Sequence, residues 1–190
     1  MTTFSFHPVK PITTGEGGMI VTDNEELYKK LVLFCSHGIT RDENLMTKTE
    51  GGWYYQQLAL GYNYRITDIQ CALGCSQMKK LDGFLARRRE LAERYDEAFS
   101  ECENIITPYQ LPDTVSGWHL YIIQVLNCNR REVFEKLRAE GIGVNVHYIP
   151  VYKHPYYQEN GYAQVQCKNA EEVYSHMLSL PLYPGLTFEQ

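Results

Sequence analysis

The sequence contains no long apolar run and no excess of positive charge. None of its apolar stretches approaches the length of a membrane span, and no secretory signal pattern is present. Lysine and arginine number 18 against 23 aspartate and glutamate residues, which gives a net charge of −5. A general nucleic-acid-binding protein is usually basic. We therefore expect a cytoplasmic protein that binds neither a membrane nor a nucleic acid.

Motifs for disulfides and metal ions are also missing. The six cysteines are scattered, no two form a Cys-x-x-Cys pair, and free thiols are expected. Cys71 and Cys75 lie four residues apart on a predicted helix. Because no second ligand pair accompanies them, we expect small buried helix residues rather than a zinc site. His147 and His154 lack a third ligand at suitable spacing, so the sequence predicts no metal site.

What is present has the composition of an ordinary globular protein, with 44% hydrophobic and 22% charged residues among 190. A strand–helix–strand order near the C-terminus predicts a small α/β domain. We expect strands over residues 4–7, 19–22, 119–126 and 143–148, and helices over residues 25–35, 69–80, 81–101, 130–140 and 170–180. Residues 36–52 and 149–162 are predicted loops, and Arg87, Arg88 and Arg89 are expected on a solvated helix face.

Lys10 occupies an unusual position between two prolines. Pro8 and Pro11 each fix their own φ and keep the preceding residue out of a helix, which predicts a stiff, extended segment around Lys10. The glycines from Gly15 to Gly18 then allow a sharp turn. A lysine held in this way can present its amine to one fixed carbon, as in a Schiff base with a carbonyl cofactor. An ordinary solvated turn is the alternative that the local pattern leaves open.

The lysine segment resembles a known cofactor-binding motif. Residues 5–10 read SFHPVK and residues 13–18 read TTGEGG. Together they resemble the cofactor-lysine segment of the DegT-type nucleotide-sugar aminotransferases, which are fold-type I enzymes that use pyridoxal 5'-phosphate (PLP). The resemblance implies that Lys10 is the catalytic lysine and binds PLP. It also implies that the Ser5 hydroxyl donates a hydrogen bond to the PLP phosphate.

Two further motifs follow in the order that this family has. Residues 61–72 read GYNYRITDIQCA and resemble the family's asparagine–arginine motif. The likeness implies that Asn63 binds the phosphate of the other subunit's cofactor across a homodimer interface, and that Arg65 binds the sugar nucleotide. Residues 141–152 resemble the family's C-terminal histidine–tyrosine–proline segment, which implies substrate contacts from His147, Tyr148 and Tyr152. Packing in a core is the alternative for the two tyrosines.

The resemblance also implies a fold and a division of the chain. We expect an α/β protein equivalent to the C-terminal half of a fold-type I PLP-dependent transferase, because the long segment that precedes the lysine in this family has no counterpart in the sequence. Residues 1–80 would be the end of the large PLP-binding domain. Residues 81–103 would be a long linking helix, and residues 104–190 the small C-terminal α/β domain.

The reaction that the resemblance implies is amino transfer to a sugar. An amino acid, expected to be glutamate, would donate its amino group to a UDP-linked 4-keto-6-deoxy-N-acetylhexosamine, a step toward pseudaminic acid. PLP would be the electron sink and Lys10 the proton carrier. Two alternatives stay open. One is a PLP-dependent sugar lyase or dehydratase of the same fold, although known dehydratases carry histidine in place of the lysine. The other is a catalytically inactive α/β fragment.

Overall fold

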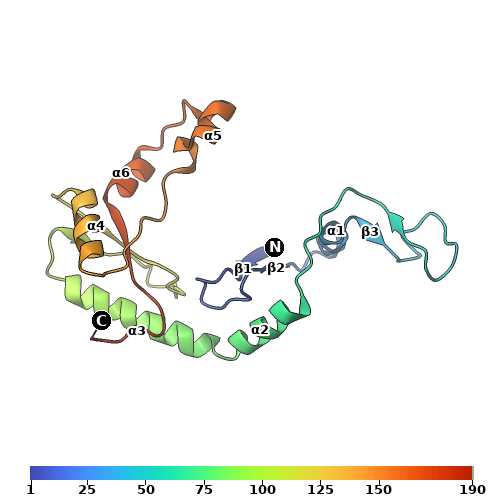
Figure 1. The fold of residues 1–190 in the computed structure, drawn as a ribbon, viewed down its shortest axis with the longest axis horizontal. Helices are drawn as coiled ribbons and strands as arrows, with labels where there is room; N and C mark the ends of the chain where they lie inside the picture. The colour runs from blue at the N-terminus through green and yellow to red at the C-terminus, as the bar shows by residue number, and fades with distance from the viewer. Residues whose placement is uncertain (190) are drawn as a thin grey trace. The chain divides into compact units, whose positions relative to one another are not determined.

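The N-terminal part of the structure is built on a short hairpin. The computed structural model describes residues 1–189, and its first compact unit is Met1–Leu81. Strands β1 (Thr2–Ser5) and β2 (Gly18–Val21) pair antiparallel (Figure 1). The predicted pairing around the Lys10 turn is therefore confirmed, although both strands begin and end one or two residues earlier than expected.

Capping residues set the starts of the two helices that follow. The side chain of Asn24 accepts a hydrogen bond from the Leu27 amide at the start of α1 (Glu25–Cys35). Thr67 precedes α2 (Asp68–Met78) and forms a reciprocal cap with a glutamine three residues further on. Both helices are predicted from the sequence, and both are confirmed with ends that differ by two residues at most.

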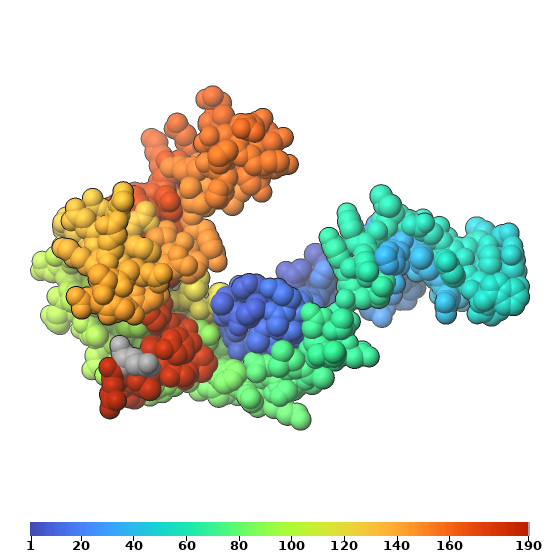
Figure 2. All heavy atoms as spheres, viewed as in Figure 1, coloured from blue at the N-terminus to red at the C-terminus, as the bar shows by residue number. Residues whose placement is uncertain are grey.

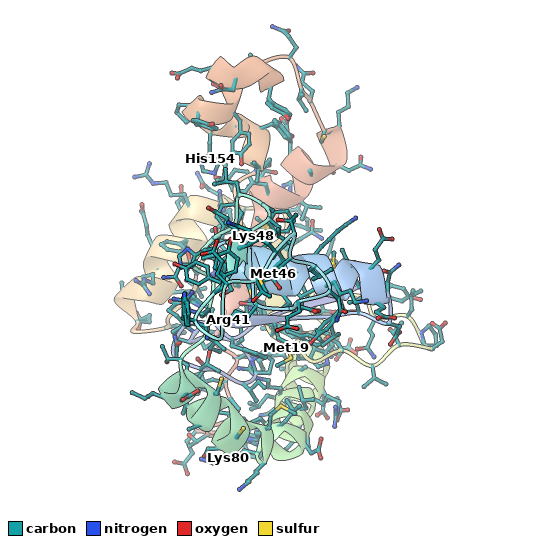
Figure 3. All side chains as sticks on the ribbon, turned by 90° about the vertical axis from the view of Figure 1, so that its right-hand side faces the viewer. Met19, Arg41, Met46, Lys48, Lys80 and His154 are labelled. Carbon is teal, nitrogen blue, oxygen red and sulfur yellow. The ribbon has the colours of Figure 1, made fainter. Side chains whose placement is uncertain are left out.

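The segment between these helices is not the plain loop that we predict over residues 36–52. Strand β3 (Ile39–Thr40) lies inside it and pairs antiparallel with β4 (Gln56–Gln57). Figure 3 labels Arg41, Met46 and Lys48 on the connection between the two strands, which is largely exposed. Each strand has only two residues, too few to show an alternating pattern in the sequence.

The first unit has almost no buried interior. All nine buried apolar residues within 1–189 lie from Leu91 onward, outside this unit. Both faces of the β1–β2 hairpin are exposed, and the side chains of Phe4, Met19 and Ile20 are about half exposed. Figure 2 shows the hairpin side chains, in dark blue, at the surface. A surface of this kind is normally covered in a folded protein. Hydrogen bonds and turns, rather than an apolar core, therefore order this unit.

The second unit begins at Asp82 and has an apolar core between a long helix and a sheet. The sheet is antiparallel with the order β5 (Ile105–Ile106), β6 (Tyr121–Val125), β7 (Met177–Leu180). Helix α3 (Leu81–Phe99) contributes two residues to the core. Helix α3 covers most of residues 81–103, the segment that we predict as a long linking helix, and this helical prediction is confirmed as far as Phe99.

Two predicted elements of this unit are wrong in part. Residues 143–148 form no continuous strand, and only Asn145 makes a bridge, to Ser179. The predicted helix over residues 170–180 is instead α6 (Lys168–His176) followed directly by β7, because the residues of β7 find backbone partners along β6. By contrast, the helix predicted over residues 130–140 is confirmed as α4 (Arg130–Ala139), and its cap is Asn129.

Short helical turns replace the loop that we predict over residues 149–162. They are η1 (Val151–Lys153), α5 (Pro155–Tyr157) and η2 (Gln158–Tyr162). Pro155 takes the first position of α5, where its missing amide removes no helical hydrogen bond. Figure 1 shows these turns in orange beside α6, and His154 is labelled at the start of α5 in Figure 3.

The arginine run from Arg87 to Arg89 does not lie wholly on a solvated face, which corrects the sequence prediction. Arg88 is only 4% exposed. Its Nη1 donates to the carbonyl oxygens of Leu182, Trp118 and His119 at 2.8, 3.0 and 3.3 Å. Desolvation by burial lowers the pKa of Arg88. The guanidinium therefore ties α3 to the segment before β6 and to the segment after β7, which meet at the same end of the sheet.

The cysteines also differ from one expectation. All six are free thiols, as predicted, but Cys71 and Cys75 are exposed on α2 rather than buried. In the part of the chain that the structure describes, none of the helices is long and apolar enough to cross a membrane. Among the same residues, no group of three or more His, Cys, Asp or Glu side chains could hold a metal ion.

We expect two leucines of the second unit to contribute very differently to stability. Leu178 is fully buried, whereas Leu111 is 55% exposed. Leu178→Ala should lower the free energy of unfolding by about 2–5 kcal/mol because it leaves a cavity, and Leu111→Ala should change it by less than about 0.5 kcal/mol. Urea unfolding, followed by Trp118 fluorescence in a Trp53→Phe background, measures both changes. Similar losses in the two variants would contradict this core.

Candidate functional site

The loop that carries Lys10 is closed by hydrogen bonds to the backbone of Phe6. The Phe6 amide donates to the Gly17 carbonyl at 2.9 Å. The Phe6 carbonyl accepts from the Thr14 amide at 3.1 Å and from the Thr13 hydroxyl at 2.9 Å. These three bonds join the two ends of the loop, so the loop has a defined shape although it lies in the unit with little buried surface.

Lys10 itself lies on a turn, which differs from the extended segment that we predict. Its amide donates to the His7 carbonyl at 3.0 Å, and Pro8 occupies the second position of this turn. The fixed φ of proline suits that position, so Pro8 favours a turn here. The Lys10 residue is half-buried. The double-proline setting therefore restrains Lys10, as predicted, but does so by turning the chain.

Gly17 is required by the packing of this loop. A Cβ atom at this position would lie 2.3 Å from the Thr14 hydroxyl oxygen and 3.2 Å from Ile66 Cδ1. Thr14 is itself buried, and its hydroxyl donates to the Glu16 carbonyl at 2.7 Å. The glycine therefore allows Thr14 and the segment around Ile66 to approach the base of the lysine loop closely.

Gln70 joins the lysine loop to the asparagine–arginine motif. Its Oε1 accepts from the Thr67 amide at 3.0 Å in the cap of α2, while its Nε2 donates to the Glu16 carbonyl at 2.8 Å. One amide side chain thus fixes the start of a helix and the base of the loop at once. Gln70 is not among the site residues that we predict from the sequence. The only signal for it was its position three residues after a threonine cap, which indicates a helix start.

The segment that carries Asn63 runs beside the end of α1. The Tyr62 amide donates to the Phe34 carbonyl at 2.7 Å, and the Tyr64 amide donates to the Cys35 carbonyl at 2.9 Å. Asn63 forms an isolated bridge with Ser36. The backbone of the motif is therefore fixed, while the side chains of Asn63 and Arg65 are exposed and can reach a ligand or a partner.

The first unit contains a groove of about 660 Å³ next to these motifs. Its lining is mostly apolar and comes from the hairpin, α1 and the segment after it, for example Met19, Val32 and Tyr62. Arg65 lines the groove, but Ser5, Lys10 and Asn63 do not. A phosphate requires hydrogen-bond donors. The apolar lining therefore suits contact with another apolar surface better than it suits an anionic cofactor.

Ser5 and Lys10 meet the minimum that PLP requires of this loop. Ser5 ends β1, opposite Gly18 in the hairpin register, and its exposed hydroxyl oxygen accepts from the His7 amide at a long 3.5 Å. The hydroxyl keeps its own proton for donation to an anion. The segment thus carries one hydroxyl donor, at Ser5, and one amine, at Lys10, the two kinds of group that a phosphate and a carbonyl require.

The remaining predicted site residues lie in the second unit. The rings of His147 and Tyr148 are in edge-to-face contact with centroids 4.7 Å apart, and Tyr148 is 71% exposed. His147 Nδ1 is 2.7 Å from the Ser179 hydroxyl, and its Nε2 is 3.2 Å from Asn145 Nδ2. Tyr148 therefore offers an exposed aromatic surface, and the ring of His147 is held by Ser179 and Asn145.

Tyr152 has polar partners within the protein. Its hydroxyl donates to Glu171 Oε1 at 3.0 Å and accepts from the Cys167 amide at 3.2 Å, and Lys153 donates to the other Glu171 oxygen at 2.8 Å. Desolvation, followed by the bond to Glu171, raises the pKa of Tyr152. The bond from Lys153, followed by the one from Tyr152, lowers the pKa of Glu171. Tyr152 thus fastens η1 to α6, a structural task that the sequence did not indicate.

The chain matches the DegT/DnrJ/EryC1/StrS aminotransferase family over residues 1–190. It is 41% identical over 189 residues to a UDP-4-amino-4,6-dideoxy-N-acetyl-beta-L-altrosamine transaminase of Campylobacter jejuni, covering 98% of this chain and 48% of that protein. The chain spans about half the length of the curated relatives it matches.

Solved structures agree with this match. Helicobacter pylori PseC, an aminotransferase involved in the biosynthesis of pseudoaminic acid, superposes with a TM-score of 0.87 at 35% identity, over 98% of this chain and 49% of that one. A Streptococcus pneumoniae protein assigned as a sugar aminotransferase, solved in its PLP form, gives a TM-score of 0.84 at 32% identity, over 99% of this chain and 48% of that one.

The chain therefore belongs to the DegT/DnrJ/EryC1/StrS aminotransferase family. The resemblance inferred from the lysine motif is confirmed, and so is the predicted fold class, since the chain has about half of an α/β aminotransferase fold. The roles of the individual residues and the domain boundaries stay predictions.

We expect Gln70→Glu to loosen the lysine loop without removing the cap of α2. A glutamate can still accept from the Thr67 amide, but it cannot donate to the Glu16 carbonyl. The Phe6 and Thr14 amides should therefore exchange with solvent about three- to tenfold faster, the effect of one lost hydrogen bond. Hydrogen exchange read by NMR measures this. Gln164→Glu, the same change at an exposed site in the second unit, is the control, and equal exchange in both variants would contradict the link.

Proposed function

We propose that this chain carries part of the active site of a PLP-dependent sugar aminotransferase. The observation that supports this most directly is Lys10 on a turn closed by three hydrogen bonds to Phe6. We further propose that the amino acceptor is a UDP-linked 4-keto-6-deoxy-N-acetylhexosamine and the donor an amino acid such as glutamate. The similarity to the Campylobacter jejuni transaminase supports this substrate class.

PLP, when bound, supplies the carbonyl group and the electron sink for amino transfer. In this proposal Lys10 would hold the cofactor through its amine and, once the incoming amino acid has displaced it, the free Nζ would carry the proton that amino transfer moves. The Ser5 hydroxyl donates to the phosphate, and the Asn63 amide donates to the phosphate held by a second copy of the chain. The planar guanidinium of Arg65 offers paired donors to the diphosphate of the sugar nucleotide.

The second unit contributes contacts to the sugar in this proposal. The exposed ring of Tyr148 can pack on the apolar face of a sugar, with its hydroxyl at the edge for a hydrogen bond. His147 presents its ring beside Tyr148. The hydroxyl of Tyr152 is already engaged by Glu171 and Cys167, so its contribution is the shape of the site wall.

One structural observation favours a second candidate. The first unit exposes both faces of its hairpin and contains an apolar groove, so by itself this chain could be an inactive α/β module that binds another protein surface. A sugar dehydratase of the same fold has less support because residue 10 is lysine. The predicted domain boundaries at residues 80 and 103, the homodimer and the cytoplasmic location stay predictions within the proposal.

We expect Lys10→Ala to abolish turnover in the assembly in which this chain is active. No other residue of the lysine loop carries an amine, so the loss should be at least about 10³-fold, the scale seen when a covalent catalytic group is removed. Borohydride reduction should fix the cofactor to the peptide that contains Lys10, as read by mass spectrometry.

The matched control for this experiment is Lys30→Ala. Lys30 is exposed and pairs only with Glu26 on its own helix, 3.4 Å away, so its loss should leave turnover and labelling unchanged. Multiple turnover by Lys10→Ala without added amine would overturn the assignment, as would labelling of a different lysine.

We also expect activity to return when two inactive variants are mixed. In a symmetric dimer with shared sites, a Lys10→Ala chain and an Asn63→Ala chain form one intact site and one doubly altered site. The mixed dimer should therefore regain about half of the activity of the unsubstituted dimer. Mixing Lys10→Ala with Lys10→Arg is the control and should restore nothing. No recovery in the first mixture would show that Asn63 serves the cofactor of its own chain or none.

A further inference from the structure

A buried serine lies behind His147. Asn145 and Ser179 form an antiparallel bridge, with amide-to-carbonyl distances of 3.1 and 2.8 Å in the two directions. Ser179 is the middle of β7 and is only 3% exposed, so its hydroxyl must find a partner within the protein. That partner is His147 Nδ1 at 2.7 Å.

The second ring nitrogen of His147 is also engaged. Its Nε2 lies 3.2 Å from the Nδ2 atom of Asn145. The direction of the Asn145 amide is set by its other end, because Oδ1 accepts from the Val146 amide at 2.8 Å. The group that faces His147 is therefore the NH₂ group, which can only donate. It follows that Nε2 accepts and carries no proton.

The proton of the neutral ring must then sit on Nδ1. An imidazole with an unprotonated Nε2 carries its hydrogen on Nδ1, and the Ser179 hydroxyl accepts from it. A hydrogen on Nε2 would face the NH₂ group of Asn145, which is also a donor. The surroundings therefore select the Nδ1–H form of the two neutral forms.

We propose that Ser179 and Asn145 are positioning residues that orient the ring of His147 and select its Nδ1–H tautomer, as a fixed part of the sugar-binding wall. The proposal rests on the proposed function only in assigning His147 to a substrate site. Because both ring nitrogens are taken, His147 contributes an oriented ring surface beside Tyr148 rather than a proton. Neither Ser179 nor Asn145 needs to touch the substrate.

The proton position can be measured directly in the 190-residue chain. Long-range proton–nitrogen NMR correlations, recorded with ¹⁵N-labelled histidine, distinguish the two neutral forms and the cation. We expect the neutral ring of His147 in the Nδ1–H form. The Nε2–H form or a mixture of the two neutral forms would overturn the proposal.

Two substitutions test the partners separately. Asn145→Asp can still accept from the Val146 amide but presents an acceptor to the ring, so Nε2 should become protonated. Asn145 is exposed, so this variant should fold. Ser179→Ala leaves the Asn145 donor in place, so the Nδ1–H form should persist, but the Nδ1 hydrogen loses its acceptor and its chemical shift should change. Ser179→Thr, which restores a hydroxyl, should recover the original shift. Ser100→Ala, on a hydroxyl that binds only the Glu97 carbonyl, is the control. An unchanged spectrum in Asn145→Asp would overturn the proposal.

Kinetics in the active assembly test the consequence for the substrate. Ser179→Ala should raise KM for the nucleotide sugar about three- to tenfold, the effect of one lost hydrogen bond, with little change in kcat or in KM for the amino acid. Ser179→Thr should restore KM. An unchanged sugar KM would overturn the positioning role. Absence of turnover in every variant, with the Nδ1–H form intact, would count against the proposed function and leave the hydrogen-bond arrangement supported by the spectra.

Discussion

The buried guanidinium of Arg88 is the constraint around which the second unit is arranged. A buried charge is unfavourable unless its donors find acceptors, and three carbonyl groups, from Trp118, His119 and Leu182, accept from its Nη1 here. These carbonyls precede β6 and follow β7, so one side chain of α3 helps to fix where β6 begins and where β7 ends. The place of β7 in turn decides where Ser179 lies, and therefore how the ring of His147 is held.

The first unit is ordered without an apolar core. Its order depends on the backbone of Phe6, on the side chain of Gln70 and on the space that Gly17 leaves. These contacts lie within the loop or at its base, so they do not require the exposed faces of the hairpin to be covered. The backbone of the Lys10 loop is thus restrained locally, while the apolar groove beside it is available for contact with another surface.

The sequence predicted what depends on local rules. Capping residues at Asn24 and Thr67 indicate two helix starts, because capping involves only neighbouring residues. The sequence predictions are wrong where a partner far away in the sequence determines the structure. Met177–Leu180 continues a helical apolar pattern but becomes a strand because β6 offers a ladder. Arg88 lies three residues before Leu91 on α3, but we predict it on a solvated face because its three carbonyl partners could not be read from the pattern.

The candidate site shows the same division between local and distant information. Motif likeness predicted residues that are expected to contact a ligand. It did not predict the residues that support them by hydrogen bonds, which are Gln70 for the loop of Lys10, Ser179 for His147, and Glu171 for Tyr152. Each of these holds its neighbour by a hydrogen bond across 18 or more positions in sequence. Such hydrogen bonds fix the orientation of a neighbouring group and take no part in a reaction themselves. Two family members with identical motifs can therefore present the same groups at different angles, and differences in sugar preference should be sought at these supporting positions.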